Sequence, residues 1–155
     1  ITIKGKSISD SCDLIALPLD LNKETREKVT NAIQFARLFN SEVRAFSVSF
    51  SDDDESIKNK LNSTLYQVSE FITSKGVKCS TDLVEIPSSA SFSSSIVKYS
   101  EDINADLIMI MTKGEENLDL NFLGSNARQL INKSDIPVMS IRPAAKKDMS
   151  TYIIQ

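Results

Sequence analysis

Short apolar runs alternate with stretches of helical periodicity through most of this chain, and the alternation limits the folds open to it. Runs with the composition of buried strands occur at residues 13–19, 42–50, 77–86, 105–112 and 136–141. Between them, apolar side chains recur at helical spacing within residues 23–40, 57–72, 92–103 and 125–133. Strands that alternate with helices form a parallel sheet, which right-handed crossovers cover on both faces. The sequence therefore predicts a three-layer α/β sandwich around a five-stranded parallel sheet.

The folded part is predicted to be a single domain over residues 13–142. A length of 155 residues is typical of one domain with a substantial core. Residues 1–12 are polar and mixed, and we expect an N-terminal linker there. Residues 143–155 form a polar C-terminal tail that ends in YIIQ.

Composition argues against several classes of function. The net charge of −3 and the pI near 5.0 disfavour a nucleic-acid partner, which requires a concentrated basic patch. No apolar run approaches membrane-spanning length and no signal peptide is visible, so no membrane partner is expected. Histidine is absent, which removes the usual activator of Ser and Cys nucleophiles. Cys12 and Cys79 lack metal-site spacing and indicate a cytoplasmic protein.

The chemistry of the chain is concentrated between residues 105 and 128. This stretch consists of the most continuous apolar run, a polar loop and a helix that opens on Gly124-Ser125. A glycine lets a backbone approach a ligand closely, and a helix N-terminus presents free N–H groups to a phosphate. The same pair also suits a helix start that needs close packing and a capping hydroxyl. Phosphate binding and a purely structural role both stay open on this evidence.

Three passages of the chain carry a resemblance to a known family. They are LIALPLDLNKETREKVTNAIQFARLFNSEV (residues 14–43), NADLIMIMTKG (104–114) and LGSNARQLINKSDIPVMSIRP (123–143). Together they resemble a universal stress protein (Usp) domain. The resemblance implies the Usp-like adenine-nucleotide-binding fold with strand order 3-2-1-4-5, and a ligand crevice between strands 1 and 4. In that order strands 1 and 3 are not neighbours, so Cys12 and Cys79 are expected to be too far apart for a disulfide.

The ATP-binding motif of the family lies in register on this chain. Nucleotide-binding members carry G-x-x-G, nine residues and then G-[ST]. Gly114 matches the second glycine, nine residues intervene, and Gly124-Ser125 completes the motif, with Asn126 following it. The resemblance thus implies that these residues hold the phosphates of ATP.

Other parts of the implied site are less regular. Met111 replaces the first glycine of the motif, and its side chain is expected to fill the volume of the ribose. Asp20 matches the aspartate on the adenine side, and Val48 matches the apolar adenine contact. Residues 113–119 carry one lysine and three acidic residues, a net charge of −2. A triphosphate beside such a loop calls for Mg²⁺ as a bridge.

Two hypotheses of different classes follow. In the first, the chain is a non-enzymatic regulatory domain of the stress response that binds ATP or another adenine nucleotide, with Mg²⁺, at Asp20, Val48, Met111, Gly114, Gly124, Ser125 and Asn126. In the second, the site is degenerate and the domain serves dimerisation or partner docking. The resemblance implies a homodimer through residues 136–141. Because the chain begins at Ile1, packing against a second Usp domain of a tandem protein is the other expectation.

Overall fold

The computed structural model describes residues 11–21, 25–111 and 123–141. They form a five-stranded, all-parallel sheet in the order β3-β2-β1-β4-β5, which confirms the predicted fold class and strand order. The strands are β1 (Leu14–Leu19), β2 (Glu42–Phe50), β3 (Cys79–Ile86), β4 (Leu107–Met111) and β5 (Val138–Ile141). The helices are α1 (Thr25–Phe39), α2 (Glu55–Ser74), α3 (Phe92–Asp102) and α4 (Leu123–Lys133).

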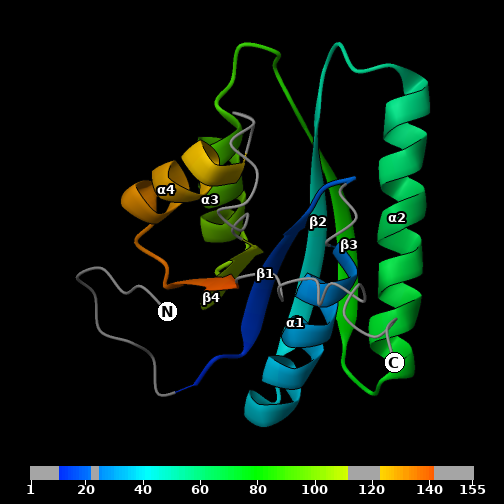
Figure 1. The fold of residues 1–155 in the computed structure, drawn as a ribbon, viewed down its shortest axis with the longest axis vertical. Coiled ribbons are helices and arrows are strands. Elements are labelled where there is room, and N and C mark those ends of the chain that lie inside the picture. Colours follow the sequence, from blue (N-terminus) through cyan, green and yellow to red (C-terminus); the bar gives the residue numbers. More distant parts are fainter. Residues whose placement is uncertain (1–10, 22–24, 112–122, 142–155) are drawn as a thin grey trace, which may run out of the picture.

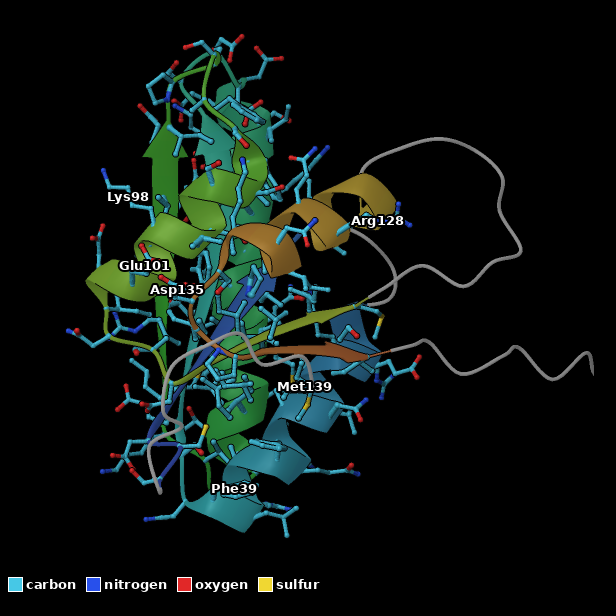
Figure 2. The ribbon with its side chains drawn as sticks, turned by 90° about the vertical axis from the view of Figure 1, so that its left-hand side faces the viewer. Phe39, Lys98, Glu101, Arg128, Asp135 and Met139 are labelled. Carbon is cyan, nitrogen blue, oxygen red and sulfur yellow. The ribbon has the colours of Figure 1, made fainter. Side chains whose placement is uncertain are left out.

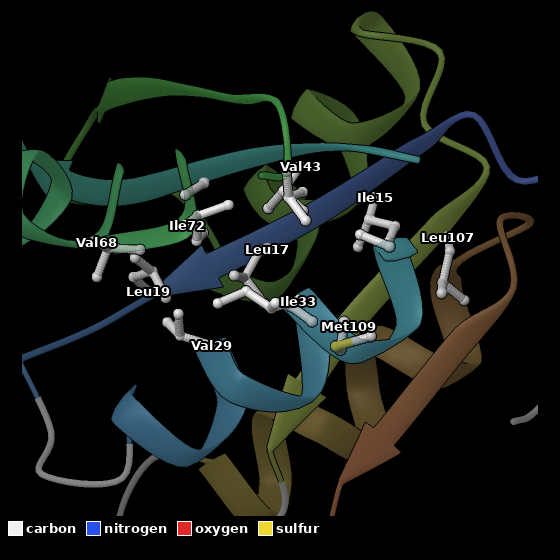
Figure 3. Packing of buried hydrophobic residues seen from close by; sticks show 14 of the residues in the cluster. Ile15, Leu17, Leu19, Val29, Ile33, Val43, Val68, Ile72, Leu107 and Met109 are labelled. Atoms are coloured by element: carbon white, nitrogen blue, oxygen red, sulfur yellow. The ribbon is translucent and has the colours of Figure 1, made fainter. Parts of the chain in front are cut away.

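The helices cover the sheet in pairs and create two hydrophobic cores. Helices α1 and α2 lie on one face, and α3 and α4 lie on the other (Figure 1). Strand β1 supplies both cores because its side chains alternate. Ile15 and Leu17 enter the α1–α2 core, to which both helices contribute residues (Figure 3), and Ala16 enters the α3–α4 core. All three side chains are fully buried, so β1 is the centre of the molecule.

Several helix ends are set by residues that allow an abrupt change of backbone direction. Asn40 after α1 and Asn104 after α3 adopt positive φ angles of 56° and 55°. Asparagine tolerates this left-handed conformation better than most residues. Ser91 begins α3, since its hydroxyl accepts the backbone N–H of Ser94 at 3.4 Å. These caps turn each helix back toward the sheet with little intervening chain.

Three strands begin two residues later than the apolar pattern predicts. The pattern placed Val77 in the third strand, but its N–H donates to the Ile72 carbonyl at 3.4 Å and so belongs to the end of α2. Similarly, the N–H of Ala105 donates to the Ser100 carbonyl at 2.9 Å, which keeps it out of β4. In the last strand, Ile136 accepts a bond from the Ser134 hydroxyl before β5 begins. Apolar residues at these positions fill the core from turns.

A polar network closes the α3 side of the sheet near its β3 edge. The Arg44 guanidinium lies 3.1 Å from the Asp82 carboxylate and donates to the Ser80 hydroxyl at 2.6 Å. The Tyr99 hydroxyl donates to the same Asp82 carboxylate, and its ring packs on Phe46 with centroids 4.4 Å apart. Burial, followed by the bond to Asp82, raises the pKa of Tyr99 to about 12. The network therefore ties β2, β3 and α3 together away from the predicted crevice.

Two further expectations concern cysteines and membranes. Cys12 and Cys79 are both free thiols, as their predicted separation requires. None of the described helices combines the length and the apolarity that a membrane crossing needs.

Candidate functional site

The sheet opens between its two central strands at their carboxyl ends. The paired residues of β1 and β4 are Ile15 with Leu107 and Ala16 with Ile108. Beyond these pairs β1 runs on to Leu19 while β4 runs on to Met111. The strand order also reverses at this point. Strand β1 has β2 as its neighbour on one side and β4 on the other. Ligands of open α/β sheets bind at such a switch point.

A small cavity lies at this opening. Its volume within the described residues is about 30 Å³. Strands β1 and β4 and helices α1, α3 and α4 all contribute to its wall, through Pro18, Leu19, Asp20, Lys28, Phe92, Ser93, Ile96, Ile110, Ala127 and Leu130. The apolar side chains of α3 and α4 on this wall belong to the α3–α4 core, so the cavity is a gap at the edge of that core.

Two charged side chains line the cavity. Asp20 directly follows β1 and is partly exposed. Lys28 lies in α1 and is only 5% exposed. Its ammonium group donates to the backbone carbonyl of Pro18, with Nζ 2.5 Å from the oxygen. The crevice thus offers a carboxylate at its edge and a buried positive charge inside it.

The structure brings one predicted side chain, that of Asp20, to the cavity. Val48 is 8% exposed and belongs to the α3–α4 core, on the face of β2 that points toward the cavity side, but it does not line the cavity. Met111 is 3% exposed at the end of β4. Because strand side chains alternate, Met111 faces the α1 side of the sheet, opposite Ile110, which lines the cavity.

The phosphate motif is described only in part. Gly114 lies outside the described residues. Gly124, Ser125 and Asn126 form the first turn of α4, whose helix begins at Leu123, before the predicted start. Nothing is described of their side chains, but Ala127 and Leu130 of the same helix line the cavity. Helix α4 therefore borders the crevice through Ala127 and Leu130, and a role of Gly124, Ser125 and Asn126 in the site stays a prediction.

Sequence reasoning did not identify Lys28 or Ser93 as members of this site. Ser93 is fully buried in the first turn of α3. A signal for Lys28 was present, because it lies one helical turn before Ala32 and next to Val29 on the buried stripe of α1. A lysine at an inward position of a helix indicates either a buried acceptor for its ammonium group or a ligand-binding site.

Neither cysteine thiol has the lowered pKa of a nucleophile. Burial raises the pKa of the Cys12 thiol and of the Cys79 thiol, so both favour the unreactive protonated form. Within residues 11–21, 25–111 and 123–141, no group of three or more acidic or thiol side chains could hold a metal ion. The charged groups at the crevice, the Asp20 carboxylate and the Lys28 ammonium group, are suited to recognition.

Known proteins resemble this chain in sequence and in fold. Residues 13–142 match the universal stress protein family. A universal stress protein of Methanocaldococcus jannaschii is 28% identical over 147 residues, which cover 86% of this chain and 84% of that protein.

Solved structures agree in fold. An Archaeoglobus fulgidus universal stress protein in complex with dAMP superposes with a TM-score of 0.65 at 20% identity, covering 83% of this chain and 97% of the other. A universal stress protein in complex with cAMP gives a TM-score of 0.69 at 15% identity, with coverages of 86% and 98%. UspA of Lactobacillus plantarum gives 0.72 at 15% identity, with coverages of 86% and 100%. The family match spans most of the chain, the fold agrees, and the crevice lies where the strand order reverses; the chain belongs to the universal stress protein family.

Proposed function

We propose that this chain is a regulatory domain of the stress response whose crevice between β1 and β4 binds an adenine nucleotide. One observation carries the proposal: the cavity at the switch point is lined by Asp20 and by two residues of α4, the helix whose first turn contains the Gly124-Ser125 pair. Related proteins of the same fold hold dAMP and cAMP in their solved structures.

The chemistry of the groups supports this ligand class. The first turn of α4 has backbone N–H groups without helical partners, and such groups stabilise phosphate charge. Asp20 offers a carboxylate that accepts hydrogen bonds from ribose hydroxyls or from an adenine amino group. Apolar side chains, among them Ile96 and Ile110, supply a surface for the face of a base. Phosphates near the acidic residues 113–119 would come with Mg²⁺ as their bridge.

The role we propose is binding without catalysis. The sequence contains no histidine, and the raised pKa of both thiols disfavours them as nucleophiles. A nucleotide that is bound and not consumed acts as a signal through its concentration. Cytoplasmic location, which the cysteine usage indicates, fits a sensor of adenine nucleotides and stays a prediction.

We further propose that two copies assemble through β5, or that β5 packs against a second Usp domain. Strand β5 is an edge of the described sheet, and edge strands are the ones that can add a partner strand. The side chain of Val138 is 2% exposed and packs inward, whereas Ser140 is exposed. Ser140 is thus the residue at which the contact between copies can be altered without disturbing the core.

The proposed function is tested by calorimetry on the purified chain. We expect saturable binding of ATP near micromolar affinity in the presence of Mg²⁺, and released adenine nucleotide when freshly purified protein is denatured. Asp20→Ala should weaken the binding, whereas Asp135→Ala, at an exposed acid labelled in Figure 2, should leave it unchanged. The proposal is wrong if ATP, dAMP and cAMP all fail to give a heat of binding at concentrations up to millimolar.

A second function has its own support. The cavity of about 30 Å³ is roughly a tenth of the 300 Å³ at which small-molecule sites begin. If the crevice stays that small, the domain acts as a dimerisation or docking module without a nucleotide. In that case the calorimetry shows no binding, while the copies still associate through β5.

A further inference from the structure

A lysine side chain occupies the interior of the crevice. Lys28 is 5% exposed, and α1 points it inward because it shares the buried stripe with Val29 and Ala32. Burying a long charged side chain costs both desolvation and rotamer freedom. An apolar residue would fill the same position at lower cost, so the packing of α1 does not by itself account for a lysine there.

The ammonium group of Lys28 has a specific acceptor. It donates to the Pro18 carbonyl with Nζ 2.5 Å from the oxygen. Pro18 lies beyond Ala16, the last residue of β1 that pairs with β4, so this carbonyl belongs to the stretch where the two strands have separated. Lys28 thus bridges from α1 to the open end of the sheet, across the point where a ligand would enter.

Among the described residues, the space left beside Lys28 is small compared with a nucleoside. The cavity holds about 30 Å³, whereas small-molecule sites begin near 300 Å³. The other wall residues named above come from strand ends and from α3 and α4, which pack against each other in the α3–α4 core. A flexible lysine stem, in contrast, can leave its position by changing rotamers.

We propose that Lys28 is the specificity-determining residue of this crevice. With its ammonium group on the Pro18 carbonyl, its side chain excludes an adenine nucleotide, and the nucleotide binds only when that contact is broken. Binding must therefore offset the lost hydrogen bond, which lowers affinity in the natural chain. This inference rests on the proposed function, since the adenine nucleotide proposed above is the ligand concerned.

The test compares ATP binding by the natural chain and by Lys28→Ala in the same calorimeter, with Mg²⁺ present. Lys28→Ala removes the side chain beyond Cβ and frees the Pro18 carbonyl, so we expect ATP affinity to rise at least tenfold. Lys28→Met, with nearly the same length and no charge, should keep the crevice filled and gain much less. Lys98→Ala, at an exposed lysine of α3 that points away from the ribbon in Figure 2, should change nothing.

The outcomes separate this inference from the proposed function. ATP binding by the natural chain with no gain in Lys28→Ala would overturn the inference and leave the proposed function standing. Binding by Lys28→Ala alone would support the inference and remove nucleotide binding as the role of the natural chain. Absence of binding in both proteins would overturn both. Circular dichroism checks the fold, and Lys28→Ser replaces Lys28→Ala if the alanine variant does not fold.

Discussion

The Asp106 carboxylate, at the start of β4, forms hydrogen bonds with the backbone at the start of β1. One of its oxygens accepts the backbone N–H groups of Asp13 at 2.8 Å and of Leu14 at 2.9 Å. The Asp106 backbone N–H in turn donates to the Leu14 carbonyl at 2.9 Å. Asp106→Ala removes the two bonds to the carboxylate and keeps the main-chain bond. We therefore expect this substitution to loosen the junction of the two central strands without breaking it.

The size of the effect follows from the exposure of these groups. A hydrogen bond to a charged group contributes about 1.5–3 kcal/mol to stability. Asp13 is exposed and both Leu14 and Asp106 are partly exposed, so water replaces part of what is lost. We expect Asp106→Ala to lower the free energy of unfolding by about 2 kcal/mol, since two bonds at less than full strength are lost. For a domain of this size that corresponds to a fall in Tm of about 4–8 °C.

Urea denaturation followed by circular dichroism measures this change. Asp106→Asn keeps an acceptor oxygen without its charge, so it should lose about half as much, near 1 kcal/mol. Asp135→Ala, at an exposed acid labelled in Figure 2, should stay within about 0.5 kcal/mol of the natural chain. Two results would contradict this expectation. One is an Asp106→Ala variant with the same free energy of unfolding as the natural chain, and the other is an asparagine variant that loses as much as the alanine variant.

Three further predictions concern ionisation and assembly. Burial raises the folded-state pKa of Tyr99 from 10.0 to about 12, so its contribution to stability is present below pH 10 and lost as pH rises toward 12. Alkaline unfolding curves of Tyr99→Phe should lack this loss, and an identical decline would contradict it. Because burial raises the pKa of the Cys12 and Cys79 thiols, a thiol reagent at pH 7 should label the folded chain at least tenfold more slowly than the urea-unfolded chain. Ser140→Asp, at the exposed residue of β5, should convert a dimer to a monomer in light scattering; an unchanged mass in a dimeric protein would exclude that interface.

The architecture was predictable because buried faces of helices and strands require apolar residues at characteristic spacings along the sequence. Strand and helix identities followed from apolar spacing, and the strand order followed from the family resemblance. Spacing alone misplaced the ends of elements, as at Val77, which is 5% exposed yet uses its N–H at the end of α2. A buried apolar residue looks the same in a strand and in the turn before it. Only its hydrogen-bond partner distinguishes the two.

The site was predictable in position and less so in composition. Asp20 was found because it ends a strand at the carboxyl edge, where the fold binds ligands. Lys28 was missed because a charged residue in an amphipathic helix is ordinarily assigned to the solvated face. Its burial depends on the Pro18 carbonyl, a partner exposed by the separation of β1 from β4. Met111 was expected to fill the ribose volume, but its side chain faces the α1 side of the sheet, whereas Lys28 lines the cavity.

The central claim is that an adenine nucleotide binds between β1 and β4. Methyl-resolved NMR during an ATP titration tests both the binding and its place. We expect saturable shifts at Ile96, Ile110 and Leu130, which line the cavity, and little change at Leu65 and Ile72, which belong to the α1–α2 core on the opposite face. Spectra that remain unchanged at millimolar ATP, or shifts confined to the α1–α2 core, would contradict the account.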